Sequence, residues 1–308
     1  MTIALDRTAV APLPTLRAAG KVLDPAPERL GRLTPSSPNQ DIASLRTTLG
    51  RQGYVWLKGF LDPVAVNDFR GYVFSHLMDT GIVRPGSDPR LGLASDEPEA
   101  RDKVNKRIME LVRAAAYEAF CAQQRLWRFM DEFLGGISYL HRRKLLRHTL
   151  PKTAAVTPAH YDLVYLRGGT DRIVTVWIPI GDVPAEMGGL VYLEGSHVQG
   201  VRLEAEFREK SLDLTPAERI DAYNKHMAEG GWISKDLPGM AERFNTRWLA
   251  ADYQAGDIVL HSPYMIHAST MNEDRMGRTR LSTDIRYQNV SDEIDARWAN
   301  HWSLDDML

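Results

Sequence analysis

The feature that most constrains this chain is a histidine and a carboxylate two residues apart, His160 and Asp162, in the segment Thr157-Pro158-Ala159-His160-Tyr161-Asp162. We expect the segment to be extended, and residues i and i+2 of a strand point to the same face. The imidazole and the carboxylate could therefore bind one small ion together. Two ligands do not make a metal site, so the fold must supply a third. A His-x-Asp triplet also arises by chance, in a surface loop or as a simple hydrogen-bonded pair.

A third ligand is available at His267, which closes a second apolar, strand-like run, Leu260-His261-Ser262-Pro263-Tyr264-Met265-Ile266-His267. Two histidines and one carboxylate form the facial triad of non-haem Fe(II) oxygenases, which leaves three coordination positions open. Strict alternation would turn His261 to the same side as His267, but Ser262-Pro263 is expected to interrupt the strand between them. We therefore expect the metal ligands to be His160, Asp162 and His267. His197, in a Gly-Ser-His turn, is expected to be structural.

Several separate pieces of the chain, taken in order, resemble one protein family. Residues 157 to 197 read TPAHYDLVYLRGGTDRIVTVWIPIGDVPAEMGGLVYLEGSH, and residues 256 to 282 read GDIVLHSPYMIHASTMNEDRMGRTRLS. These pieces comprise His-x-Asp, a strand with Trp, Gly-Gly-Leu, Gly-Ser-His, Gly-Asp before the distal histidine, and Arg followed by Leu-Ser. Together they resemble the phytanoyl-CoA dioxygenase family of Fe(II)/2-oxoglutarate oxygenases, over roughly residues 40 to 288.

The resemblance implies Fe(II) at the three ligands, 2-oxoglutarate as cosubstrate and O2. An arginine suits the far carboxylate of 2-oxoglutarate because its planar fork donates two hydrogen bonds. Spacing leaves several candidates, which are Arg275, Arg278, Arg280 and Arg286. The resemblance selects Arg278, eleven residues after His267, and it also implies that Trp177 and Ser269 touch the cosubstrate. The other arginines would equally form ordinary ion pairs, and Trp177 would equally suit the plain core.

The expected activity is hydroxylation of an unactivated C–H bond in a small organic substrate, with decarboxylation of 2-oxoglutarate to succinate. Since Asp162 is present, no ligand position is freed for chloride, so hydroxylation is favoured over halogenation. Desaturation and ring formation remain open as alternatives. No catalytic residue is expected beyond the metal centre, and the substrate-binding residues are unknown. Two alternatives remain open: a cupin-like metalloenzyme that does not use 2-oxoglutarate, and a non-catalytic small-molecule binding protein on the same scaffold.

Composition bears on location and partners. The formal net charge is −2 with mixed charges, so nothing suggests nucleic acid or a membrane surface as a partner. The only cysteine is Cys121, which fits a reducing compartment. The N-terminus lacks the pattern of a signal peptide, and no window approaches a transmembrane span. We expect a cytoplasmic protein.

The order of expected elements predicts an α+β fold with a mainly β core, a double-stranded β-helix of the jelly-roll or cupin type with flanking helices. Residues 1–40 are expected to form an arm, and 41–308 a single domain with a polar insert at about 200–247. Helices are expected at 41–50, 63–77 and, as one or two, 98–134, with another after the capping box at Thr215. Strands are expected at 144–150, 160–166, 172–178, 189–193, 257–261 and 278–287. The tail, 291–308, is expected to be helical and to pack on the body or on a second subunit of a homodimer.

Overall fold

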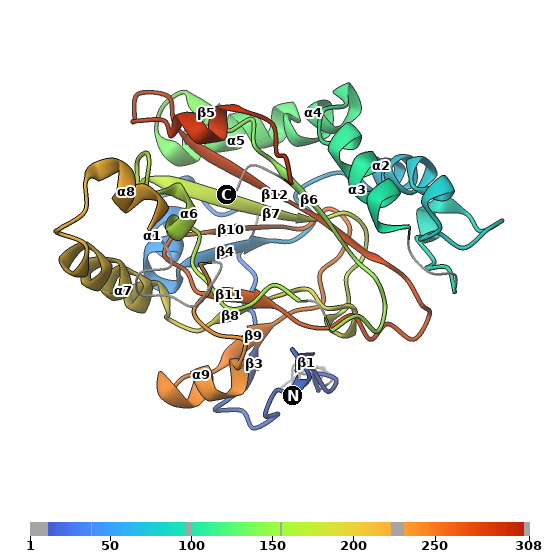
Figure 1. Cartoon of the computed structure of the whole chain (residues 1–308), viewed down its shortest axis with the longest axis horizontal. Coiled ribbons are helices and arrows are strands. Elements are labelled where there is room, and N and C mark those ends of the chain that lie inside the picture. Colours follow the sequence, from blue (N-terminus) through green and yellow to red (C-terminus); the bar gives the residue numbers. More distant parts are fainter. Residues whose placement is uncertain (1–11, 38, 97–99, 155, 223–230, 305–308) are drawn as a thin grey trace, which may run out of the picture.

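Two β-sheets face each other in the computed structural model, which describes residues 12–37, 39–96, 100–154, 156–222 and 231–304 (Figure 1). The large sheet has the strand order β4-β10-β7-β12-β5, with β6 also paired to β12, and the small sheet has the order β11-β8-β9-β3. The large sheet contains β4 (Tyr54–Leu57), β10 (Ile258–His261), β7 (Ile173–Pro179), β12 (Arg280–Asn289), β5 (Ser138–Leu140) and β6 (Leu145–Thr149). The small sheet contains β11 (His267–Ser269), β8 (Leu190–Leu193), β9 (Trp248–Ala250) and β3 (Leu30–Arg32). This is the predicted double-stranded β-helix.

The central strand β7 is buried along its whole length, because both faces of the large sheet are covered. Val174, Val176 and Ile178 belong to the core that the sheet shares with the helices. Trp177 alternates with them and packs in the core between the two sheets. The helices therefore cover the outer face of the large sheet, and the small sheet covers its inner face. The candidate metal ligands lie between the two sheets.

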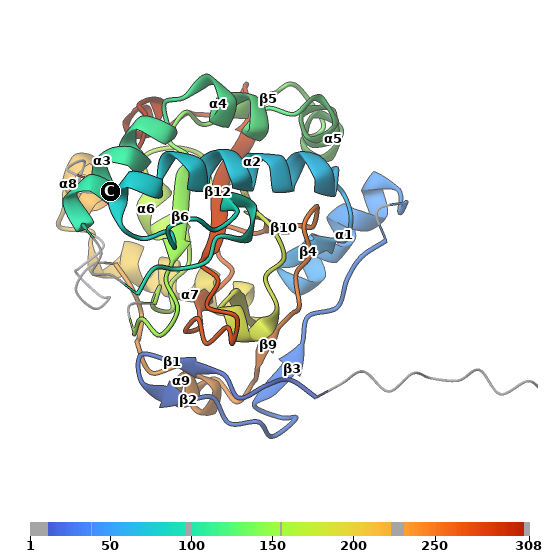
Figure 2. The ribbon, with the colours of Figure 1, turned by 90° about the vertical axis from the view of Figure 1, so that its right-hand side faces the viewer.

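The outer face of the large sheet is covered by helices (Figures 1 and 2). These are α2 (Pro63–His76), α3 (Arg101–Leu111), α4 (Ala115–Cys121) and α5 (Gln124–Leu134), with α1 (Ile42–Gln52) beside β4. As predicted, the Asp62 side chain caps α2 by accepting from the Val64 amide, and Pro63 occupies the first turn. The one or two helices expected at 98–134 are three, because the chain breaks around 112–114 and 122–123.

The strand predicted at 160–166 is wrong. Asp162 has helical backbone angles, φ −66° and ψ −30°, and it opens the short helix α6 (Leu163–Leu166). His160 forms a single bridge, in which its backbone N–H and C=O bond to those of His267 at 3.1 and 2.9 Å. The run Leu-Val-Tyr-Leu was misleading because a short apolar run does not distinguish a buried strand from a buried helix.

The polar insert is more helical than expected. It contains α7 (His197–Lys210), α8 (Pro216–Asp221) and α9 (Leu237–Arg243). The capping box at Thr215 is confirmed, since both of its reciprocal bonds with Glu218 are present. The sequence also predicts that this helix continues to about Met227, and residues 223–227 of that range lie outside the described residues.

The described parts of the N-terminal arm and of the tail lie against the barrel. In the N-terminal arm, β1 (Arg17–Ala18) pairs with β2 (Lys21–Val22), and β3 joins the small sheet by pairing parallel to β9. The helical tail predicted at 291–308 is wrong over its described part, where only a short 3-10 helix, η4 (Ala296–Ala299), forms. Within the described part of the chain, no helix combines the length and the apolar character needed to cross a bilayer.

Candidate metal centre

Three side chains from two segments meet between the sheets: His160 and Asp162 from one, and His267 from the other. One donor atom of each lies within 4.8 Å of the others, and all three residues are buried. Asp162 Oδ1 is 3.5 Å from His160 Nε2 and 3.8 Å from His267 Nε2. His267 is fixed as the first residue of β11, and the backbone bridge to His160 brings the two imidazoles together, with ring centroids 4.3 Å apart. The residues expected to bind a metal are therefore adjacent.

Hydrogen bonds select the tautomer of both imidazoles. His160 Nδ1 lies 2.8 Å from the Pro158 carbonyl oxygen, and His267 Nδ1 lies 2.9 Å from that of Met265. A carbonyl only accepts, so each Nδ1 carries the proton and each Nε2 lone pair is free for a metal. Burial first, and then the neighbouring His160 and His261, hold the pKa of His267 well below its usual range. The ring is therefore neutral, as a ligand must be.

One oxygen of Asp162 is engaged by three donors that the sequence did not predict as its partners. Oδ2 accepts from Thr175 Oγ1 at 2.5 Å and from Arg286 Nη2 at 3.2 Å, and it lies 3.3 Å from His261 Nε2. Burial alone would raise the pKa of Asp162, but Arg286 and then the hydrogen bonds of His160 and His261 outweigh it and hold the pKa well below 3.8. The carboxylate is thus ionised, with Oδ1 left to face the histidines.

Of the two arginines Arg278 and Arg280, the structure places Arg280 at the wall of the metal-side cavity, which Arg147 and Arg286 also line. Arg280 is the first residue of β12 and lines a small cavity with the three candidate ligands, whereas Arg278 does not line it. Arg278 precedes the strand and pairs with Asp274, its Nη2 lying 2.7 Å from Oδ1. Arg280 donates to Thr149 Oγ1 from Nη2 at 2.7 Å and from Nε at 3.2 Å. Burial lowers the pKa of Arg280 to about 10, so it stays charged near neutral pH.

Trp177 and Ser269, the other two residues expected at the cosubstrate, line two different cavities near the centre. Trp177 lines the small cavity together with Arg280. Ser269 follows His267 on β11, and its Oγ accepts from the Thr157 amide at 2.8 Å. This bond ties the strand of His267 to the segment that leads into His160. Ser269 lines a second cavity beside the first.

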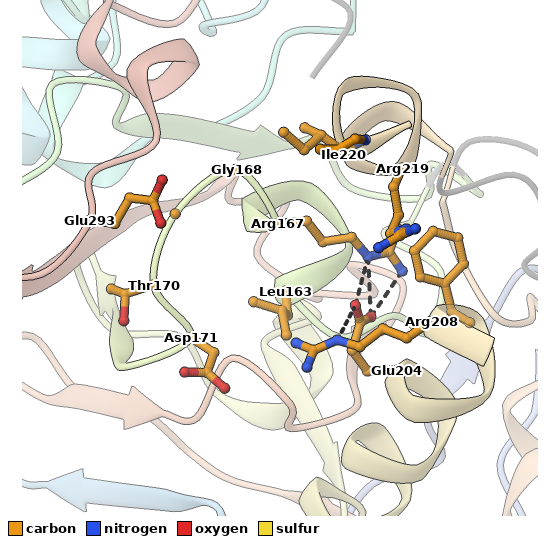
Figure 3. Close-up of a pocket in the computed structure, with 13 residues that line it drawn as sticks. Leu163, Arg167, Gly168, Thr170, Asp171, Glu204, Arg208, Arg219, Ile220 and Glu293 are labelled. Carbon is orange, nitrogen blue, oxygen red and sulfur yellow. Dashed lines mark hydrogen bonds and ion pairs between the residues drawn. The ribbon is translucent and has the colours of Figure 1, made fainter. Parts of the chain in front are cut away.

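That second cavity, of about 290 Å³, adjoins the metal-side cavity because Arg147, Thr157 and Arg280 line both. Its apolar walls come from α3, β6, the segment before His160 and the tail, and they are Ile108, Met109, Leu146, Val156, Trp302 and Leu304. A larger cavity, of about 470 Å³, lies beside α6 and shares no lining residue with the metal-side cavity (Figure 3). None of the candidate ligands lines the 290 Å³ cavity either, but its three shared residues place it next to the centre.

The donor set fits iron with an anionic cosubstrate. Two neutral imidazoles and one carboxylate on one side of an ion are the ligands of the facial triad. Among the described residues, Arg280 Nη1, Trp177 Nε1 and Arg286 Nε and Nη1 are buried without a hydrogen-bond acceptor. Buried donors are costly unless they are paired. These unpaired donors belong to residues that line the metal-side cavity, so an anion bound there would satisfy them.

The chain matches one family model by sequence, and its fold is similar to those of several solved structures. The family model of phytanoyl-CoA dioxygenase (PhyH) matches residues 49–279. The 1-deoxypentalenic acid 11-beta-hydroxylase of Streptomyces exfoliatus is 25% identical over 248 residues, which are 78% of each chain. The epimerase SnoN, solved in complex with Fe3+, alpha ketoglutarate and nogalamycin RO, has a TM-score of 0.54 at 17% identity and covers 82% of this chain and 85% of its own. EctD from S. alaskensis has a TM-score of 0.53 at 15% identity over 94% and 92%.

Proposed function

Because the chain belongs to the phytanoyl-CoA dioxygenase family of Fe(II)- and 2-oxoglutarate-dependent oxygenases, we propose that it hydroxylates an unactivated C–H bond of a small organic acid. The observation that carries the proposal is the convergence of His160, Asp162 and His267 beside Arg280 in one buried cavity. The bound centre supplies the oxidation of the C–H bond, coupled to decarboxylation of 2-oxoglutarate to succinate. The chain supplies position and shelter.

In this proposal, His160, Asp162 and His267 hold the iron, and Arg280 binds the far carboxylate of 2-oxoglutarate. Arg280 takes the role that the sequence resemblance gave to Arg278, because its guanidinium is buried in the same cavity as the ligands. A buried, pre-oriented guanidinium binds a carboxylate with two hydrogen bonds, whereas the guanidinium of Arg278 is already paired with Asp274. Trp177 lines the cosubstrate space with a free indole N–H, and Ser269 fixes the segment beside it.

Asp162 decides between reaction types. A carboxylate that occupies the third protein position leaves no place for a halide ligand, so hydroxylation is the proposed outcome. Its Oδ2 is held by Thr175, His261 and Arg286, which leaves Oδ1 as the ligand atom. One-oxygen ligation keeps three coordination positions open for the keto acid and dioxygen.

The substrate class follows from the 290 Å³ cavity. A volume near the lower end of ligand pockets suits a compact molecule, and the walls combine the apolar residues named above with polar and charged ones. Arg147 lines both cavities and pairs through Nε with Asp284 Oδ2, at 2.9 Å. Its partly exposed guanidinium is the cation beside which a substrate carboxylate would bind. The relative of S. exfoliatus is named for hydroxylating an acid, which supports this choice.

The proposal is tested by supplying Fe(II), 2-oxoglutarate and O2 with a panel of compact carboxylic acids and their methyl esters, and measuring succinate and hydroxylated product together. We expect product from acids and much less from esters. Asp162→Ala should abolish both readouts. Tight Fe(II) binding without affinity for 2-oxoglutarate would favour a cupin-like metalloenzyme instead, and no charge-transfer band with anaerobic Fe(II) and 2-oxoglutarate would favour a binding protein.

A further inference from the structure

The inner face of α7 carries three residues spaced four apart, Ser196 at the N-cap, Gly200 and Glu204. Residues i, i+4 and i+8 lie along one side of a helix. All three are buried, although α7 lies at the edge of the barrel and its opposite face is exposed (Figure 1). This face of α7 touches both segments that carry the candidate metal ligands.

At one end of this face, Glu204 contacts the segment of His160 and Asp162. Tyr161, which lies between these two residues, is fully buried and donates from its hydroxyl to Glu204 Oε2 at 3.0 Å. Arg167, just after α6, binds the same carboxylate from Nε and Nη2, each at 2.9 Å to its nearer oxygen. Figure 3 shows Arg167 and the more exposed Arg208 both directed at Glu204. The carboxylate thus joins α7 to residues on both sides of Asp162.

The guanidinium of Arg167 is buried over the ring of Phe207, one turn along α7, with its carbon 3.7 Å from the ring centroid. A buried ion pair with a third hydrogen bond is a rigid contact, because each group lacks an alternative partner in water.

At the other end of this face, Ser196 and Gly200 contact the segment that leads into His267. Ser196 Oγ accepts from the Ile266 amide at 3.0 Å. A Cβ on Gly200 would lie only 2.0 Å from the Tyr264 carbonyl oxygen, so only glycine allows this approach of the helix. The Gly-Ser-His turn expected from the sequence is therefore the start of a helix that touches the backbone next to a ligand.

We propose that the inner face of α7, through Glu204 and Tyr161 on one side and Ser196 on the other, supports the backbone bridge between His160 and His267 in fixing the spacing between the two ligand segments, and so raises the affinity for the metal. The proposal rests on the proposed function. The support from α7 matters most for His160 and Asp162, because these residues belong to no continuous strand, whereas His267 begins a strand of the small sheet. Tyr161, Glu204 and Ser196 are positioning residues, since none donates an atom to the metal.

The test compares Tyr161→Phe with Tyr287→Phe in the full chain. Both remove one buried hydroxyl, because Tyr287 donates to the Cys121 carbonyl oxygen at 3.1 Å, on the helix side of the large sheet. Anaerobic Fe(II) titration gives the affinity, and thermal unfolding of the metal-free protein gives the stability. We expect both variants to lose similar thermal stability, while only Tyr161→Phe weakens Fe(II) binding, by about 3- to 10-fold, less than the 10- to 100-fold typical of direct partners of a metal ligand.

A second variant keeps the proposal open to refutation if either protein is poorly stable. Ser196→Ala alone and with Tyr161→Phe should weaken Fe(II) binding non-additively, because both changes release the same spacing. Equal Fe(II) affinity in Tyr161→Phe and Tyr287→Phe would overturn the role of α7. Strictly additive effects of Ser196→Ala and Tyr161→Phe on Fe(II) affinity would overturn it as well. Failure of the wild-type protein to bind Fe(II) would instead refute the proposed function.

Discussion

Arg286 Nη2 lies 3.2 Å from Asp162 Oδ2, and both side chains are buried. The guanidinium is the main favourable charge that keeps the pKa of Asp162 low against the effect of burial. We predict that Arg286→Gln, which keeps a donor but removes the charge, weakens Fe(II) binding by about 10- to 100-fold. Anaerobic Fe(II) titration measures the change. Arg275→Gln, at an exposed position, is the control, and equal affinities in the two variants would contradict the prediction.

Arg280 and Arg278 provide a matched pair for the cosubstrate. Arg280→Met should raise the KM for 2-oxoglutarate by at least about 30-fold, since removing one partner of a buried charge pair costs about 2 kcal/mol or more. Arg278→Met should leave this KM nearly unchanged, because Arg278 pairs with Asp274 outside the metal-side cavity. The measurement is succinate formation against 2-oxoglutarate concentration. A larger effect at Arg278 would restore the assignment suggested by the sequence resemblance.

The sequence could predict which residues meet at the centre better than how they meet. His160, Asp162 and His267 were identifiable because their types and order carry chemistry. The reason given for their proximity, a shared strand face, was wrong, since Asp162 is helical and His160 has only one bridge. Convergence comes from long-range backbone pairing with His267, which no local periodicity contains.

The choice between Arg278 and Arg280 shows a second limit of prediction from the sequence, which is the position where a strand begins. Alternation from 278 to 286 assumes that the strand already runs through Arg278, but β12 begins at Arg280. Residue 278 instead follows a turn in which the Asp274 carboxylate accepts from its backbone and side chain. Helix α7 was not predicted from the sequence, because its apolar stripe is short and one of its buried positions is the charged residue Glu204.

Acid should destabilise the fold through His141, which is buried and whose Nε2 lies 2.8 Å from Gln288 Oε1. Burial lowers its pKa from 6.5 to about 4. Between these values the unfolded chain binds more protons, so the free energy of unfolding decreases as pH falls from 6.5 to 4, by about 3 kcal/mol in total for this group. Urea unfolding of the metal-free protein at pH 7 and pH 5 should show a smaller loss in His141→Gln than in the wild type. Equal losses would mean that His141 titrates normally in the folded state.

The cavity beside the centre can be filled without touching the candidate ligands. Met109 on α3 is half-buried and lines the 290 Å³ cavity, so Met109→Trp should occupy space that the substrate needs. We expect kcat/KM for the substrate found in the acid screen to fall about 10-fold or more, in line with a cost of about 1–3 kcal/mol for overpacking. Fe(II) affinity and the KM for 2-oxoglutarate should stay near wild type, and succinate formed per product should rise because the keto acid is consumed without productive substrate binding. Met276→Trp, at a 62% exposed position outside this cavity, is the control. Normal coupling in Met109→Trp would show that the substrate reaches the centre by another path.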